Sequence, residues 1–426
     1  MLNSKILEIE ESLKDEFKKI ENVCFVNSEK VLNAFHKFNL NTSDFNGTTG
    51  YGYGDVGRDK IDEIFADVFH AEKALVRTQF ISGTHALTVA LFGLLRPGEK
   101  FISITGKPYD TLEPVIGITP NKSSLKSFEI DFDYIDLKDG DFDYDRIREV
   151  LGENIKLIHI QRSIGYACRS TLSIEKVSKV IDFIRKINSE IIIFVDNCYC
   201  EFCNTLEPTD VGADIVVGSL IKNLGAGVVN NGAYVVGKEK YVDLVAERLT
   251  VPGQGDHVGP SLGQNKSFLL GLYLAPSVVA SALKVKLLTK RLCDVYNVSY
   301  INGGVDDIVL GICFGNADRL SQYAKCIQKM SAIDSAFVPE ETDMPGYDSK
   351  IIMASGSFVD GSSIELSCDA PLREPYILYQ QGSLTYDYGK LAVVNAFDEI
   401  FSGGERWVIK LLTGLSGYLE LVVQDF

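Results

Sequence analysis

The chain has 426 residues, of which 46% are hydrophobic and 23% charged, so it is long enough for about two or three domains. Its net charge of -16 and the absence of a basic stripe from the sequence argue against nucleic-acid binding. The nine cysteines are odd in number and no signal peptide opens the chain, so we expect it in the reducing cytoplasm.

Helices and strands alternate through the first part of the chain. Helical spacing covers 2–37, a polar Gly-rich loop follows over 38–57, and a helix is expected at 59–69. Strands separated by helices then indicate a mostly parallel sheet covered on both faces, whose functional groups gather at the carboxyl ends of the strands. The expected strands are 74–80, 101–105, 157–161, the runs within 191–197 and 215–222, and 233–236, and the helices are 84–95, 110–116 and 174–187.

The last part of the chain has a different pattern. The most apolar stretch, 268–288, is interrupted by Pro276 and two lysines, so it predicts a buried or interface helix and no membrane span. Shorter strands at 308–314, 351–355 and 363–367 bracket a helix at 317–330. The predicted domains are an N-terminal arm over 1–45 that packs with the small domain, a large domain over 46–289, a small α+β domain over 290–400, and a tail over 401–426 that contains the single Trp, Trp407.

Two side chains follow separate strands of the predicted sheet. Asp196 ends one apolar run, and Lys222 follows the next, with Ser219 three residues before it. An enzyme that uses pyridoxal 5'-phosphate (PLP) needs a lysine to bond its aldehyde and a carboxylate to keep its pyridine nitrogen protonated, and a serine can hold its phosphate. Each residue alone is more often an ordinary strand end, but together they predict a PLP site because other segments converge on the same cofactor.

Three further segments suit such a site. Ser82, Gly83 and Thr84 follow a strand and open a helix, where free amides can bind a phosphate, although a plain helix cap is the commoner role. Tyr109 follows the next strand and can stack on the cofactor ring or pack in the core. Arg373 lies in a proline-framed loop, where it can bind a carboxylate or form a surface salt bridge.

Two other motifs could suggest a dinucleotide or a metal, but their sequence context argues against both. Residues 52–57 match the glycine pattern of dinucleotide-binding proteins, but a polar loop precedes them where that fold requires a strand. The cysteine-rich stretch 198–203 lacks the paired spacing of zinc sites, and no matching group follows it. We therefore expect no metal, and interpret these cysteines as small buried thiols near the cofactor.

The motifs resemble those of the fold-type-I PLP enzymes of cysteine and methionine metabolism. The resemblance is closest to the methionine gamma-lyase-like or "aluminium resistance" branch, which is related to the cystathionine beta-lyases. It implies an aspartate aminotransferase-like α/β fold with PLP as cofactor. The segments that carry it run in order from about residue 50 to 382: GYGYGDVGRD, VRTQFISGTHAL, SITGKPYDTLE, IQRSIGY, FVDNCYCEF, GSLIKN, DMPGYDSKIIMASGSF and LREPYILYQQG.

The resemblance also implies roles for individual residues. Lys222 would bond the cofactor, Asp196 would pair with the pyridine nitrogen, and Tyr109 would stack on the ring. Arg373 would bind the substrate carboxylate. The implied cofactor-binding set also contains residues around the phosphate: Ser82, Gly83, Thr84, Ser219, Tyr51 and Tyr53.

The sequence departs from the family pattern at several positions. Tyr51 falls where related lyases reach across a dimer interface, so we expect a homodimer or homotetramer with shared active sites. The arginine expected two residues later is Tyr53 here, so either the phosphate is held differently or Arg58 takes that role. Ile221 stands where the lyases usually carry threonine, and Cys200 stands at an expected glycine-like position.

The predicted function is a PLP-dependent carbon-sulfur lyase for a sulfur amino acid such as cystathionine, methionine or cysteine. Beta- or gamma-elimination, transamination and racemisation begin from the same carbanion, so these residues do not distinguish them. The alternatives are an aminotransferase, a PLP-binding stress-related protein without this turnover, and a nucleotide-binding protein that uses 52–57. The expected partner is a small amino-acid substrate, with no nucleic acid and no membrane.

Overall fold

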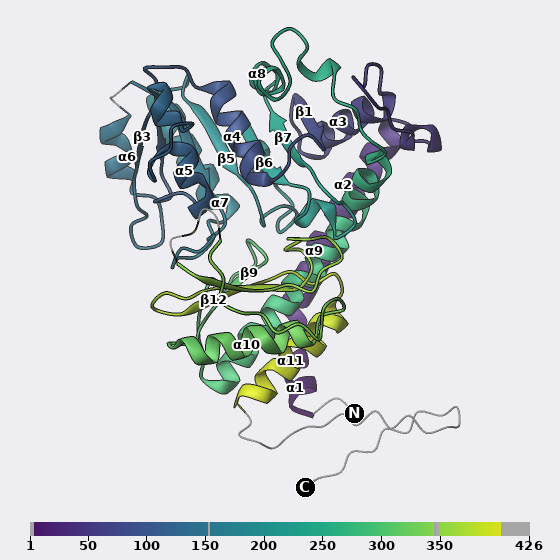
Figure 1. Ribbon diagram of the computed structural model, residues 1–426, viewed down its shortest axis with the longest axis vertical. Helices are drawn as coiled ribbons and strands as arrows, with labels where there is room; N and C mark the ends of the chain where they lie inside the picture. Colours follow the sequence, from purple (N-terminus) through teal and green to yellow (C-terminus); the bar gives the residue numbers. More distant parts are fainter. Residues whose placement is uncertain (1–3, 152–153, 345–346, 348, 402–426) are drawn as a thin grey trace.

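The computed structural model describes residues 4–151, 154–344, 347 and 349–401. They form two sheets, a larger one and a smaller one, joined by long helices that run beside both (Figure 1). Of the predicted tail over 401–426, all but Phe401 lies outside the described residues, and so does Trp407.

The larger sheet has seven strands in the order β1-β7-β6-β5-β4-β2-β3. Strands β3, β2, β4, β5 and β6 are parallel, whereas β7 is antiparallel to both of its neighbours. Because β1 is antiparallel to β7, it runs in the same direction as these five strands, and the carboxyl ends of six strands meet at one edge. The strands are β1 (Lys73–Arg77), β2 (Lys100–Ser103), β3 (Asp131–Tyr134), β4 (Ile155–Gln161), β5 (Ile192–Asp196), β6 (Ile215–Ser219) and β7 (Ala233–Gly237).

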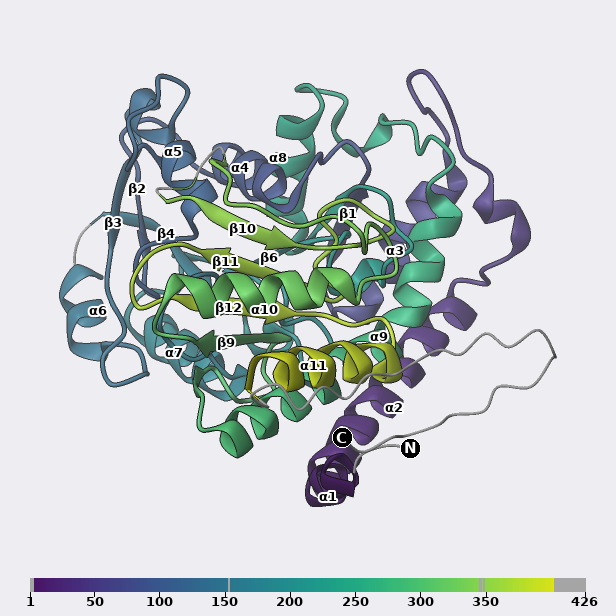
Figure 2. The ribbon, with the colours of Figure 1, turned by 60° about the horizontal axis from the view of Figure 1, so that its bottom comes forward.

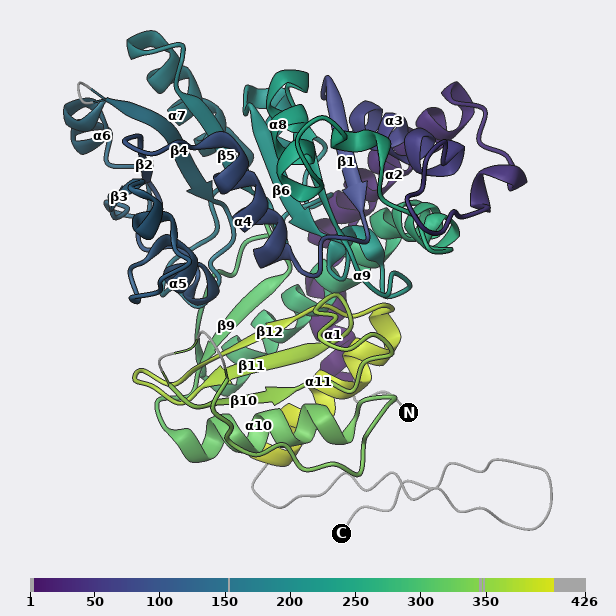
Figure 3. The same cartoon turned by 45° about the horizontal axis from the view of Figure 1, so that its top comes forward.

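Helices cover both faces of this sheet, as the alternation of helix and strand predicts (Figure 3). The central strands are apolar on both sides: in β5, Ile192 and Phe194 belong to the core beneath α4, and Ile193 and Val195 belong to the core on the opposite face. The helices on the first face are α4 (Gly83–Leu94), α5 (Glu113–Ile116) and α8 (Glu239–Leu249). Those on the second are α3 (Val56–Val68), α6 (Tyr144–Val150), α7 (Ile174–Ile187) and α9 (Asn265–Tyr296).

The smaller sheet has five antiparallel strands in the order β10-β11-β12-β9-β8. Helices α10 (Ala317–Lys329) and α11 (Tyr386–Phe401) cover one of its faces (Figure 2), and its other face turns toward the larger sheet (Figure 1). Its strands are β8 (Ser299–Ile301), β9 (Val309–Cys313), β10 (Ile351–Ala354), β11 (Ser367–Pro371) and β12 (Ile377–Gln381). The predicted α/β fold, with a mostly parallel large sheet and a smaller α+β part, is confirmed.

Several predicted element boundaries are wrong; the helix expected at 59–69, for example, is α3, which begins at Val56. The expected strand at 363–367 is a series of turns, and β11 begins only at Ser367, because Glu365 turns back to accept the amides of Phe358 and Val359. The expected strand 74–80 ends at Arg77, where the Arg77 side chain pairs with Asp62. Short 3-10 turns occur at Thr42–Phe45, Asp110–Leu112, Leu125–Phe128, Pro208–Val211, Asn223–Gly225 and Gly255–His257.

The N-terminal segment forms two helices, α1 (Ser4–Ser12) and α2 (Lys14–Lys37), and α2 packs along α9 (Figure 1). This arm contacts α11 of the small sheet, because Phe17 lies edge-on to Tyr386 at 5.5 Å and Lys390 donates to Glu10 at 2.7 Å. Helix α9 is long and apolar enough to cross a membrane, but 61% of its most apolar stretch is buried inside this protein, which is the pattern of a core helix.

A buried ion pair joins the two parts of the chain. Lys286 in α9 and Asp307, in the loop before β9, are both almost fully buried, with Nζ 2.8 Å from Oδ1. The other oxygen of Asp307 accepts from Ser163 and Thr171, which belong to the loop after β4. The small domain is therefore hydrogen-bonded to a loop at the carboxyl edge of the large sheet.

Candidate active site

Asp196 and Ser219 lie on the same face of the larger sheet, because side chains along a strand alternate between its two faces. Asp196 continues the side of β5 that faces α4, and Ser219 does the same on β6. Both open into a cavity of about 160 Å³ between the strand ends and the start of α4. The cavity is lined by Ser82, Gly83, Thr84, Leu87, Tyr109, Thr111, Leu112, Gln161, Ser163, Gly165, Asp196, Cys198, Tyr199, Ser219, Ile221 and Lys222.

Asp196 forms the buried end of this cavity and is only 7% exposed. Its Oδ1 accepts a hydrogen bond from the Cys198 amide at 3.1 Å. Burial raises the pKa of Asp196, and the charge of Lys222 opposes that shift. A buried carboxylate is stabilised by a cationic partner. The protonated pyridine nitrogen of PLP would be such a partner, and the carboxylate would keep it protonated.

Lys222 lies in the same cavity, partly buried, with Nζ 3.8 Å from the centre of the Tyr199 ring. Burial acts to lower the pKa of Lys222, but the neighbouring Cys198, Tyr199 and Asp196 outweigh it and raise the pKa. Tyr199 holds its ring there in a left-handed backbone conformation with a φ of 72°, which few tyrosines adopt. Such strain is common at functional sites.

The first turn of α4 forms the opposite wall. The Ser82 hydroxyl caps the helix by accepting from the His85 amide at 3.0 Å, which leaves the amides of Gly83 and Thr84 without an intrahelical acceptor. A side chain at Gly83 would place its Cβ 3.1 Å from that of Ser219, so glycine keeps this cradle open. Free amides, a neighbouring hydroxyl and a glycine fit the phosphate of PLP.

Tyr109 is fixed against the cavity by two contacts. Its amide donates to the Gln161 side chain at 2.9 Å, and a Cβ on Gly165 would lie 2.8 Å from its ring, so only glycine allows this approach. Its hydroxyl lies 2.9 Å from that of Tyr347, and its ring lies edge-on to Tyr166 at 5.2 Å. Tyr109 is thus one wall of the cavity, where a planar cofactor ring can stack.

Sequence reasoning missed several lining residues, notably Gln161 and Tyr199. Gln161 is the last residue of β4, so it could have been found as Asp196 was, from its place at the carboxyl end of a parallel strand. Tyr199 gave no such signal, because its position depends on the left-handed turn after β5.

Arg373 does not line the cavity in this structure. Its guanidinium is 3.5 Å from Asp110, the residue after Tyr109, and its side chain is 39% exposed. It therefore lies near the cavity's aromatic wall, and its predicted role toward a substrate carboxylate stays a prediction.

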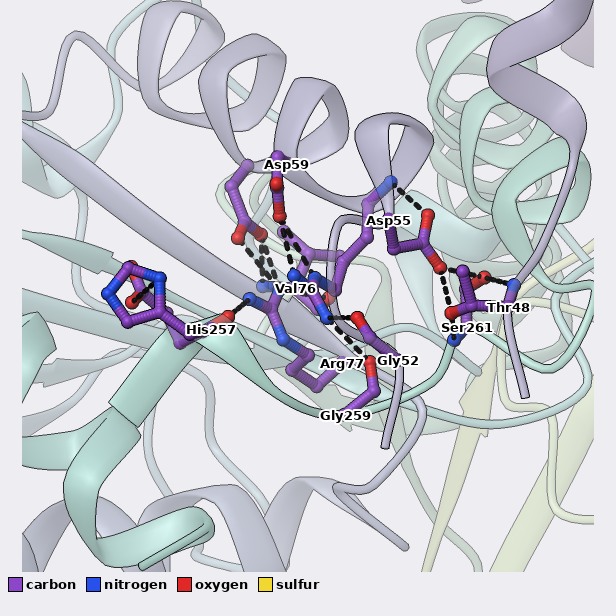
Figure 4. Close-up of polar contacts among 12 residues, drawn as sticks. Thr48, Gly52, Asp55, Asp59, Val76, Arg77, His257, Gly259 and Ser261 are labelled. Atoms are coloured by element: carbon purple, nitrogen blue, oxygen red, sulfur yellow. Dashed lines mark hydrogen bonds and ion pairs between the residues drawn. The ribbon is translucent and has the colours of Figure 1, made fainter. Parts of the chain in front are cut away.

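Tyr51 and Tyr53 also lie outside the cavity of their own chain and are 73% and 62% exposed. The loop that carries them is firmly held (Figure 4). Asp55 accepts from Thr48 and Ser261 at 2.5 Å each, and these bonds outweigh burial and lower the pKa of Asp55 to about 2. Arg58 donates to the carbonyls of Gly52 and Gly259, so it braces this loop within its own chain.

A buried carboxyl group lies behind β6. Glu201 is fully buried; its Oε1 accepts from the Tyr234 hydroxyl at 2.9 Å, and its Oε2 has no hydrogen-bond partner among the described residues. Burial raises the pKa of Glu201 from 4.5 to about 8, and the nearby Glu207 adds to the shift. The group is therefore expected to be neutral at pH 7.

Glu201→Gln should be more stable than the parent at pH 9 and equally stable at pH 5. The folded parent keeps the Glu201 proton up to about pH 8, whereas the unfolded chain releases it near 4.5, so the parent loses stability as pH rises through that window. A neutral glutamine avoids that loss, which amounts to roughly 2–5 kcal/mol. Urea unfolding at both pH values measures it, with exposed Glu190→Gln as the control. Identical pH profiles for Glu201→Gln and the parent would show that Glu201 is ionised in the fold.

A family model for methionine gamma-lyase matches residues 2–401. The chain belongs to the methionine gamma-lyase family. The uncharacterized protein YnbB of Bacillus subtilis is 42% identical to it over 407 residues, which cover 94% of this chain and 96% of that protein. Membership of the family indicates a lyase and implies PLP as the cofactor.

Solved structures agree with this family. A carbon-sulfur lyase involved in aluminum resistance from Clostridium novyi NT is 43% identical and matches with a TM-score of 0.88 over 93% of this chain and 96% of that one. The PLP-dependent protein YhfS from Escherichia coli, at 17% identity, shares the fold alone, with a TM-score of 0.61 over 89% of this chain and 97% of that one. The methionine gamma-lyase family member described here therefore has the fold-type-I architecture.

Among the described residues, no group of three or more His, Cys, Asp or Glu side chains is placed to hold a metal ion. All nine cysteines of this methionine gamma-lyase family member lie in the described part of the chain, and none of them forms a disulfide. Cys198, Cys200 and Cys203 are buried, and Cys198 lines the cavity.

Proposed function

We propose that this protein is a PLP-dependent carbon-sulfur lyase that performs beta- or gamma-elimination on a sulfur amino acid such as cystathionine, methionine or cysteine. The observation that carries the proposal is the shared cavity, into which Asp196 and Lys222 open opposite the free amides of α4. The unpaired cysteines support the reducing cytoplasm as its compartment.

The proposed roles follow from the position of each group in the cavity. When bound, PLP supplies an aldehyde for the substrate amine and a ring that withdraws electrons from the alpha carbon. Asp196 would hold the ring nitrogen, and Gly83, Thr84 and Ser219 would hold the phosphate. Lys222 would bond the aldehyde and later accept the alpha proton at Nζ.

Two further groups would orient the reactants. Tyr109, held by Gln161 and Gly165, would stack on the cofactor ring. Arg373 would bind the substrate carboxylate by leaving Asp110, a loose pair at 3.5 Å that is partly exposed. The tyrosine rings around the cavity would exclude water from the reacting carbon.

Incubation of the PLP-loaded protein with cystathionine, methionine and cysteine tests the proposal. We expect a thiol and a 2-oxo acid to appear together from at least one of the three. Conversion of the cofactor to a stable amine form, reversed by a 2-oxo acid, would identify an aminotransferase instead. Bound PLP with no product from any of the three would remove the lyase proposal.

We also propose a homodimer or homotetramer with shared active sites, since Tyr51 is exposed on a braced loop outside its own cavity. Tyr51→Phe should then weaken PLP retention several-fold without unfolding the subunit, because a hydroxyl contributed across the interface is lost. PLP dissociation measured by dialysis and absorbance checks this, with the exposed Tyr388→Phe as the control. A stable monomer with full PLP occupancy at low concentration would contradict the proposal.

A further inference from the structure

A second carboxylate faces the candidate site from the small domain. On β11, Cys368 and Ala370 are fully buried in the core with α10 and α11, so Asp369 between them points to the opposite face of the sheet, the one that turns toward the larger sheet (Figure 1). Its neighbour across the ladder is Tyr379 of β12, whose hydroxyl donates to the carbonyl of Tyr166 at 2.7 Å.

Aromatic contacts connect this position to the cavity. The Tyr166 ring stacks on Tyr379 at 5.1 Å and lies edge-on to Tyr109 at 5.2 Å, and Tyr109 lines the cavity. Burial raises the pKa of Tyr109, of Tyr166 and of Tyr199, and the Asp369 charge adds a smaller contribution to each shift. Asp369 does not line the cavity itself, but it lies on the face of β11 whose neighbour Tyr379 leads through Tyr166 to the cavity wall.

The chemistry proposed above gives Asp369 no task, because Asp196 already serves the ring nitrogen. Burial raises the pKa of Asp369, and the Tyr166 hydroxyl, the Gln381 amide and Lys222 only partly oppose it. Its Oδ2 accepts from the Gln381 side chain at 3.0 Å. A carboxylate has about four acceptor positions, so Asp369 can accept from a further donor beside Gln381 and the Tyr166 hydroxyl. A carboxylate framed by tyrosine rings is the combination that binds an ammonium group.

We propose that Asp369 selects sulfur amino acids whose sulfur-bound leaving group carries a positive charge over those with a neutral alkyl leaving group. The inference rests on the proposed lyase function and names its substrate class. Elimination breaks the bond between Cβ and sulfur, the alpha proton is lost, and the thiol leaves. Water then releases the remaining carbons as pyruvate and ammonia, so the charge on the leaving group does not enter the balance.

Two probes of equal size separate charge from shape. S-(2-aminoethyl)-L-cysteine carries an ammonium where S-propyl-L-cysteine carries a methyl group. We expect the parent to cleave the ammonium compound with a kcat/KM about ten-fold or more above that of the propyl compound, the size of one charge-assisted hydrogen bond. Asp369→Asn should lower only the ammonium compound's kcat/KM and bring the ratio near one.

Controls separate this role from a structural one. Asp387→Asn, an exposed change in α11, should leave the ratio as in the parent. Asp369→Ser provides a second variant if the asparagine disturbs folding. No preference in the parent, or an equal loss with both probes in Asp369→Asn, would overturn the inference, since the carboxylate would then act only on Lys222. If neither probe nor any natural substrate is cleaved, the lyase function fails, and the ratio of the two affinities by calorimetry still decides the role of Asp369.

Discussion

Lys222→Ala should abolish carbon-sulfur cleavage, with a loss of about 10²–10⁴-fold or more, because it removes both the attachment point of the cofactor and the proposed base. The variant should also lose the visible absorbance of a lysine-linked cofactor. Cavity geometry supports this choice of lysine, since Lys222 is the lysine among the lining residues of the cavity that holds Asp196. Absorbance spectra and thiol release, measured on the same preparation, check both expectations.

The matched control is Lys240→Ala, an exposed lysine of α8 that lies over the Tyr241 ring. It should keep the parent's colour and activity. If Lys222→Ala kept the visible absorbance after dialysis, another lysine would hold the cofactor and the site described here would be wrong.

Asp196→Asn should still bind PLP but should lose most alpha-proton chemistry. The asparagine keeps the shape of the side chain and removes the charge that would hold the pyridine nitrogen protonated. Loss of one preorganised electrostatic group at a reacting centre commonly costs about 10²–10³-fold in rate. Exchange of the alpha proton of a bound amino acid in heavy water measures this step separately from elimination.

Asp182→Asn, an exposed change on α7, is the control for charge removal. It should exchange the alpha proton as fast as the parent. If Asp196→Asn exchanged equally fast, Asp196 would be an ordinary strand end, and the proposed orientation of the cofactor in the cavity would fail.

The central part of the site could be predicted because it depends on local sequence. A parallel strand delivers the residue at its carboxyl end to a known edge, so Asp196, Ser219 and Gln161 meet without any long-range information. The cap at Ser82 and the open amides after it are equally local. Family membership and fold were predictable from these same segments.

Apart from Tyr109, the aromatic side of the site could not be predicted in this way. Tyr109 and Tyr347 are 238 positions apart, and their hydroxyls meet only because two sheets pack together. The role of Asp369 depends on which face of β11 turns inward, and the sequence placed that strand four residues too early. The 363–367 region carries alternating residues typical of a strand, but the buried Glu365 accepts backbone amides there and favours a turn.

Helix α9 couples the stability of the two domains, although they are separate in shape. It supports the Asn223–Gly225 turn next to Lys222 near its start and packs against α11 of the small domain, while Lys286 within it neutralises Asp307. Removal of the small domain would leave that lysine buried without its counter-charge, a loss that costs far more than a surface pair would. The two lobes therefore share one cooperative unit, and a ligand that tightens the pocket also raises the melting temperature of strands that never touch it.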